Sequence, residues 1–331
     1  MSKLSKTVEE GSGEMPAAFI HVAPSPHLSD ITFSTKRMMI DVLIALTPVI
    51  AMSIFMFRWY AVKQLAVCVI TCLVSEALFV SMRGKKITLN DCSAAVTGII
   101  LALSLPATAP WYVGAVGSFV AIGIGKIIFG GLGMNIFNPA MVGRAFVMIS
   151  FASLMSAGAY ENPSALIDAL SQATPMNAFK GSNIPTPVLN LFLGLTNGSI
   201  GETSALAAII GGAYLCIRRT ASWEIPAGII ATVIVLAGIA DFMAGDRGYL
   251  VLHHLFGGAL LFGAFFIATD PVTSPLTPLG KFIFGVGVGA LVMLIRIFSG
   301  YPEGLMFAIL LMNAVTPLIN LWTIPRPMGD E

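Results

Sequence analysis

Ten apolar runs, bounded by charged residues, proline or glycine, dominate this sequence and restrict what it can fold into. A helix needs about 20 apolar residues to cross the hydrocarbon core of a membrane, with a range of about 17–25. Several runs are shorter than this, so their helices are expected to extend a few residues beyond them. The runs are 38–57, 62–82, 91–105, 111–129, 136–157, 203–217, 225–240, 250–268, 281–298 and 304–321.

The composition agrees with an integral membrane protein. Charged residues make up 11% of the chain, whereas a soluble domain carries about 25%. The net charge of +1 offers no basic surface for nucleic acid, so no nucleic-acid partner is expected. The first 37 residues contain no apolar run. We therefore expect no cleavable signal peptide, and the first span itself would direct insertion.

The distribution of Lys and Arg orients the predicted spans, because cytoplasmic segments carry an excess of both. If the N-terminus is inside, twelve of these residues fall on inner segments and five on outer segments, while Arg144 falls within a span. This count places both termini in the cytoplasm. It places the long segment 158–202 outside the membrane.

Ten spans divide into two sets of five, and an odd number in each set gives the two halves opposite orientations. A faint internal similarity supports this division, since 98–106 and 258–271 both run from a glycine into a proline-bounded loop. The predicted fold is an all-α integral membrane protein of about ten transmembrane helices in two inverted five-helix repeats with interrupted helices. Its segments are a cytoplasmic N-terminus (1–37), the first repeat (38–157), an extracytoplasmic loop (158–202), the second repeat (203–321) and a cytoplasmic tail (322–331).

The predicted outer loop contains DALSQAT, residues 168–174. It matches D-x-x-[S/T]-x-A-T, the pattern at which flavin transferases attach FMN to a threonine hydroxyl, with Asp168, Ser171, Ala173 and Thr174 in the specified positions. No His or Lys base neighbours Thr174, so the sequence predicts no catalytic nucleophile there. The alternative is an ordinary connector with turn residues, although loops longer than about 12–15 residues are more often functional.

Two asparagines, Asn135 and Asn138, lie at the predicted cytoplasmic end of the fifth span, directly before Pro139. An amide both donates and accepts hydrogen bonds, which suits the pyrimidine edge of a flavin or another polar solute. The alternative is that asparagine caps a helix that begins with proline. Both interpretations remain open at this point.

A second polar motif, TDPVTSP, follows the eighth span and contains Asp270 and Thr273. Asp270 could bind the ribityl chain of a flavin or a cation. Alternatively it caps a turn, since Asp-Pro often initiates turns.

Two ionisable residues fall inside predicted spans, where a charge needs a partner, a cavity or water. Arg144 is a candidate partner for a reduced flavin or a phosphate. Glu76 lies close to the inner boundary and is expected only to snorkel toward it. The sequence predicts no metal site, because its cysteines lack C-x-x-C spacing and four thiolates must converge to hold an iron–sulfur cluster. The cysteines are Cys68, Cys72, Cys92 and Cys216.

The motifs DALSQATP, NIFNPAMVG and ATDPVTSPLTPLGK together resemble the D subunit of the Rnf electron-transport complex. They are similar, more distantly, to the B subunit of the sodium-pumping NADH:quinone reductase. The resemblance covers about residues 36–326, and the short polar N-terminus favours the Rnf subunit. Arg144 departs from some relatives, which carry an aromatic residue there.

The resemblance implies a membrane subunit of an ion-translocating ferredoxin:NAD oxidoreductase in the inner membrane of a bacterium or archaeon. It implies FMN bound covalently to Thr174 and a second, non-covalent flavin such as riboflavin near Asn135, Asn138, Asp270 and Thr273. The partners it implies are membrane iron–sulfur subunits, a second covalent-FMN subunit, and NAD-binding and ferredoxin-accepting subunits. Electron flow would drive Na⁺ or H⁺ export. A solute channel or secondary transporter is the alternative from a different class, because inverted repeats also build transporters.

Overall fold

The computed structural model of the chain describes residues 34–84, 89–155, 186–196, 198–244, 251–299 and 304–325. Within these ranges the regular elements are helices, apart from one isolated β-bridge between Pro106 and Ser199. This confirms the predicted all-α class.

Five helices in the described part of the chain are long and apolar enough to cross a membrane. Each coincides with a predicted run and extends a few residues beyond it at one end or both. The chain therefore has the helices of an integral membrane protein. They are α1 (Thr35–Phe57), α2 (Trp59–Met82), α9 (Glu224–Ala244), α12 (Pro278–Phe298) and α13 (Leu305–Thr323).

Shorter helices occupy the other five predicted runs. They are α3 (Ser93–Ser104), α4 (Trp111–Ile122) with its continuation η2 (Gly123–Ile127), α5 (Pro139–Ser150), α8 (Ala205–Ile217), α10 (Val251–Phe256), and α11 (Leu260–Phe262) with its continuation η6 (Gly263–Ile267). The remaining described elements are η1 (Leu89–Asp91), η3 (Ala152–Met155) and α7 (Val188–Leu193).

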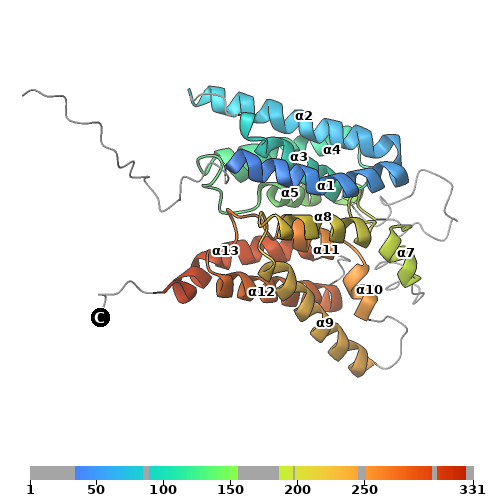
Figure 1. Cartoon of the computed structure of the whole chain (residues 1–331). Coiled ribbons are helices and arrows are strands. Elements are labelled where there is room, and N and C mark those ends of the chain that lie inside the picture. The colour runs from blue at the N-terminus through green and yellow to red at the C-terminus, as the bar shows by residue number, and fades with distance from the viewer. Residues whose placement is uncertain are drawn as a thin grey trace, which may run out of the picture.

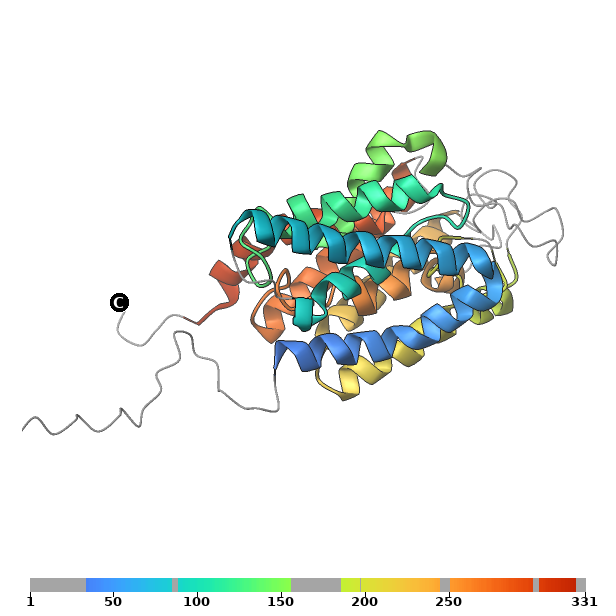
Figure 2. The ribbon, with the colours of Figure 1, turned by 90° about the horizontal axis from the view of Figure 1, so that it is seen from above.

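The helices form two groups, with α1 to α5 in one and α8 to α13 in the other (Figure 1). Helix α8 lies alongside α1, and both views show this contact between the groups (Figure 2).

The run 250–268 is broken instead of continuous. Helix α10 ends at Phe256, and α11 begins at Leu260. Gly258 between them has φ of 73°, a conformation that glycine adopts without steric cost. The guanidinium of Arg296, in α12, donates hydrogen bonds to the carbonyls of His254 and Gly257 (3.0 Å for Gly257). A buried cation thus satisfies carbonyls at the end of a broken helix, which have no partner within that helix.

The backbone carbonyls at the end of α3 find hydrogen-bond partners in a different way. The carbonyls of Leu103 and Leu105 accept hydrogen bonds from the backbone N–H groups of Gly201 and Ile200, at 2.7 and 3.0 Å. The hydroxyl of Ser53 in α1 donates to the carbonyl of Ile200 (2.7 Å). The segment just before α8 therefore supplies the partners that the short helix α3 lacks.

Each group contains one π-helix, η2 or η6, and both begin with glycine. Each is followed by an irregular segment and then by a helix with proline in its first turn. Asn138 caps α5 before Pro139, and Thr277 caps α12 before Pro278. This structural similarity pairs 123–127 with 263–267, whereas the sequence comparison paired 98–106 with 258–271.

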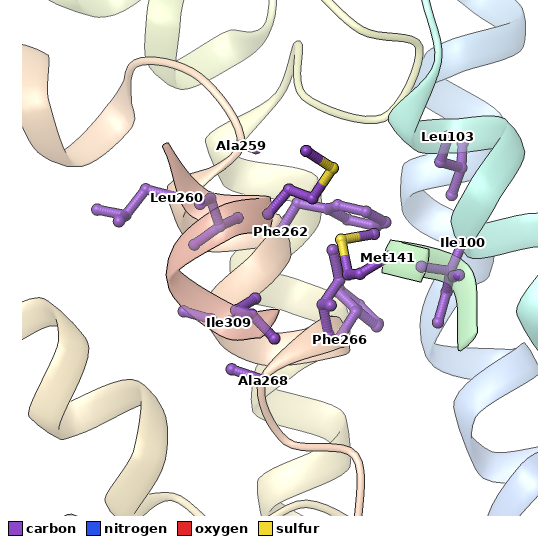
Figure 3. Close-up of a cluster of buried hydrophobic side chains, with 14 of the residues drawn as sticks. Ile100, Leu103, Met141, Ala259, Leu260, Phe262, Phe266, Ala268 and Ile309 are labelled. Carbon is purple, nitrogen blue, oxygen red and sulfur yellow. The ribbon is translucent and has the colours of Figure 1, made fainter. Parts of the chain in front are cut away.

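A buried apolar cluster joins the two groups (Figure 3). Ile100 of α3 and Met141 of α5 belong to the first group, and Phe262, Phe266 and Ile309 belong to the second. The rings of Phe262 and Phe266 lie 5.4 Å apart between centroids. This cluster packs the two groups against each other through side chains near the helix interruptions.

Gly211 allows the close approach of α8 to α1. A Cβ atom at this position would meet the carbonyl oxygen of Ala45 and the ring of Phe266. Because the first of these is backbone, the clash cannot be relieved by a rotamer change.

We predict that Gly211→Ala lowers the stability of the chain by about 1–3 kcal/mol, the usual cost of overpacking. Gly238→Ala is the matched control, because a Cβ there meets no heavy atom within 4 Å and alanine favours the helix by about 1 kcal/mol. Thermal unfolding in detergent measures both variants. A midpoint for Gly211→Ala at or above that of the unmutated chain would contradict the close contact.

Candidate functional site

A partly enclosed cavity of about 790 Å³, including its open mouth, lies between the two groups. Its walls come from the beginnings of α1 and α3, the end of η2, the region after α8, and the segments that follow η2 and η6. Apolar side chains such as Ile100 and Phe266 line it beside a few polar ones. Small-molecule sites usually have this mixture of apolar walls and few polar groups.

Three of the predicted site residues, Asn135, Asn138 and Asp270, line this cavity. They come from two segments more than 130 residues apart in sequence, and the fold brings them to one cavity. Asn135 is buried, with 5% of its surface exposed. Its Nδ2 donates to the carbonyl of Phe137 at 3.2 Å, and its Oδ1 accepts no hydrogen bond from the described residues.

Asn138 caps helix α5 and also joins the two groups. Its Oδ1 accepts from the N–H of Met141 (3.3 Å), and its Nδ2 donates to the carbonyl of Ile267 at the end of η6 (3.3 Å). Both ends of its amide are therefore engaged within the protein. Of the two interpretations that the sequence left open, the structure shows the capping role.

Asn313 of α13 ties the two polar segments together. Its Oδ1 accepts from the backbone N–H of Asn138 (3.2 Å), and its Nδ2 donates to the carbonyl of Thr273 (3.2 Å). The hydroxyl of Thr316, one turn further along α13, also donates to the Thr273 carbonyl (3.1 Å). These bonds fix both walls of the cavity to one helix.

Asp270 caps a tight turn. Its Oδ1 accepts from the N–H of Val272 and its Oδ2 from the hydroxyl of Thr273, each at 3.2 Å. Burial raises the pKa of this carboxyl above its usual value, and the two hydrogen bonds partly oppose that rise. Thr273 is buried and does not line the cavity. Its part is to hold the carboxylate of Asp270 through the hydrogen bond from its hydroxyl.

Arg144 does not line the cavity. Its Nη1 lies 3.1 Å from Oε1 of Glu202, and both side chains are buried. A buried guanidinium needs such a partner, and here the segment before α8 provides it. The predicted FMN motif, with Asp168, Ser171, Ala173 and Thr174, lies outside the described residues.

The expectation that Glu76 only snorkels is wrong. Only 2% of its surface is exposed, and its Oε1 lies 2.6 Å from Nζ of Lys126. Lys126 is equally buried and lines the cavity. The sequence prediction treated these two residues separately, as charges near the inner boundary. Their opposite signs within two apolar runs, the second and the fourth, were the available signal for a buried ion pair.

The sequence matches the NQR2, RnfD, RnfE family over residues 21–329. The chain belongs to this family. The match includes both helix groups and the whole segment between them, so the motif that contains Thr174 falls within it.

Relatives in this family cover almost the full length of the chain. One, 42% identical over 93% of this chain and 95% of its own length, is the D subunit of the Na⁺-translocating ferredoxin:NAD⁺ oxidoreductase complex of Acetobacterium woodii. Another, 40% identical over 94% and 96%, is the D subunit of the proton-translocating ferredoxin:NAD⁺ oxidoreductase complex of Clostridium ljungdahlii. A third, 39% identical over 89% and 92%, is the D subunit of the ion-translocating oxidoreductase complex of Halorhodospira halophila.

We predict that Asn138→Ala destabilises the chain by about 1–2 kcal/mol through loss of the helix cap. Asn138→Ser should recover part of this loss, because serine also caps helices but cannot reach across to Ile267. Thermal unfolding of the two variants in detergent measures the difference. Equal losses would mean that the bond to Ile267, and not the cap, carries the effect of Asn138.

Proposed function

We propose that this chain is the D subunit of an ion-translocating ferredoxin:NAD⁺ oxidoreductase complex. The observation that carries the proposal is similarity over almost the whole chain to subunits that bear this name. It favours a redox subunit over the solute channel or transporter considered as an alternative. The partners would be the membrane iron–sulfur subunits, a second FMN-carrying subunit, and the subunits that bind NAD and accept electrons from ferredoxin.

In this proposal FMN is attached to Thr174 through its phosphate. The support is the motif DALSQAT, which specifies Asp168, Ser171 and Ala173 as well as Thr174. The predominance of Lys and Arg on the other side of the predicted spans supports an extracytoplasmic position for this loop. The flavin would supply the electron-transfer chemistry, and the protein would position it.

The proposed topology has ten membrane crossings in two inverted repeats. The support is the faint sequence similarity between 98–106 and 258–271, which fall in the third predicted run of each half. The helices shorter than a full span lie against segments that satisfy their ends, as at Leu103 and His254. Discontinuous helices packed in this way commonly form the central site of inverted-repeat membrane proteins.

The second proposed cofactor is a non-covalent flavin, such as riboflavin, in the cavity between the groups. The residues present fit it. The apolar walls suit an isoalloxazine ring, and Oδ1 of Asn135 is available as an acceptor for its ring N–H. Asn138, Asp270 and Thr273 would act mainly by holding the cavity walls in place. Electrons would then pass between an outer and an inner flavin, coupled to export of Na⁺ or H⁺.

We predict that Thr174→Ala abolishes covalent flavin on the chain, because no hydroxyl remains to accept the phosphoryl group. Ser182→Ala, a hydroxyl removed from the same predicted loop outside the motif, should retain it. Flavin fluorescence after denaturing electrophoresis, and the intact mass, measure both variants from a host that expresses the transferase. Flavin retained by Thr174→Ala would rule out this attachment site.

We predict that Asn135→Leu reduces the non-covalent flavin at least tenfold while leaving covalent FMN unchanged. The leucine side chain removes the acceptor and occupies part of the cavity. Asn190→Leu, in α7 and outside the cavity lining, is the control. Extraction with acid releases only the non-covalent flavin, which chromatography then quantifies. Full retention in Asn135→Leu would place the second flavin elsewhere.

A further inference from the structure

A buried ammonium group faces the cavity between the helix groups. The described residues that line this cavity include one basic side chain, Lys126, and one acidic side chain, Asp270. Lys126 belongs to the π-helix η2, and 2% of its surface is exposed. π-Helical turns are rare and often mark functional positions. Burying a charge this deeply costs free energy, so the ammonium needs partners that offset this cost.

Two contacts hold the ammonium in place. Nζ of Lys126 donates to Oε1 of Glu76 and to Oγ of Ser93, both at 2.6 Å. Ser93 is held in turn, because its backbone N–H and its hydroxyl both donate to Oδ1 of Asp91, at 2.9 and 2.8 Å. Three helical elements, α2, α3 and η2, therefore converge on one nitrogen atom.

These contacts leave one donor unused. An ammonium carries three N–H groups, and two of them are engaged among the described residues. Since Lys126 and Ser93 both line the cavity, the third N–H is available to a group bound there. Oε2 of Glu76 is buried and has no hydrogen-bond partner among the described residues, so the local network is incomplete on its own.

We propose that Lys126 is a positioning residue that hydrogen-bonds the redox group in this cavity and favours its reduced, negatively charged form. Glu76 holds the ammonium and offsets part of its charge. This inference rests on the proposed function, because it takes the occupant of the cavity to be a flavin. Beyond that function, it identifies Lys126 as the residue that makes the cavity favour the negatively charged form of the flavin.

The electrostatic reason is the low dielectric of the site. A group that accepts an electron among these largely apolar walls gains negative charge in a low dielectric, and an adjacent ammonium stabilises that charge. The carboxylate of Glu76 opposes this effect, because it is an acceptor for the same ammonium. Removing the charge of Lys126 and removing the charge of Glu76 should therefore shift the redox equilibrium in opposite directions.

The test is the midpoint potential of riboflavin bound to the full-length chain in detergent, with Thr174→Ala present so that covalent FMN does not contribute. We expect Lys126→Gln to lower the ratio of reduced to oxidised affinity at least tenfold. For a two-electron couple this is a decrease of about 30 mV in potential. We expect Glu76→Gln to change the ratio by a similar factor in the opposite direction.

Lys281→Gln is the matched control. Lys281 also donates to a serine hydroxyl, Oγ of Ser222 at 2.6 Å, but it lies outside the cavity lining. Its removal should leave the midpoint unchanged. If Lys126→Gln does not yield a folded chain, the midpoint potential of riboflavin in Glu76→Gln alone tests the proposal. A rise in that potential supports it, because a merely structural role for the ion pair predicts no rise.

The outcomes separate this inference from the proposed function. If riboflavin binds and the two variants leave its midpoint unchanged, or shift it in the same direction, Lys126 does not set the charge preference and the proposed function stands. If the unmutated cavity binds no riboflavin, the proposed inner flavin is wrong, and the inference is overturned with it.

Discussion

The structure depends on supplying hydrogen-bond partners to backbone groups where apolar helices are interrupted. In a hydrocarbon environment an unpaired carbonyl or N–H costs several kcal/mol, so a broken helix is stable only if other segments satisfy its ends. Arg296 provides this for α10, and the backbone of Ile200 and Gly201 provides it for α3. The same requirement accounts for the buried amide of Asn138 at the seam between the groups.

This requirement also places the cavity between the helix groups. The interrupted segments cannot face lipid, so they turn toward one another, and Asn138 and Asn313 connect them across the seam. The buried cluster around Phe262 and Phe266 packs beside these bonds (Figure 3). A cavity thus arises where two incomplete helical layers meet.

The sequence located the helices well, because apolar runs and their boundaries are local signals. The family resemblance implied a common site for Asn135, Asn138 and Asp270, and these three residues line one cavity. The sequence prediction missed the pair of Glu76 and Lys126, which are 50 residues apart. The partner of a buried charge is set by helix packing, which hydropathy does not report. The choice between a ligand role and a capping role for Asn138 likewise needed the position of Met141 and Ile267.

The bonds from Asn313 and Thr316 to the two cavity walls have a consequence for how the protein is made. Both residues belong to α13, the last helix of the described chain to leave the ribosome. The polar segments after η2 and η6 therefore lack these partners throughout synthesis of the preceding helices. The cavity can therefore reach the shape seen here only after α13 has been made and has packed against both segments.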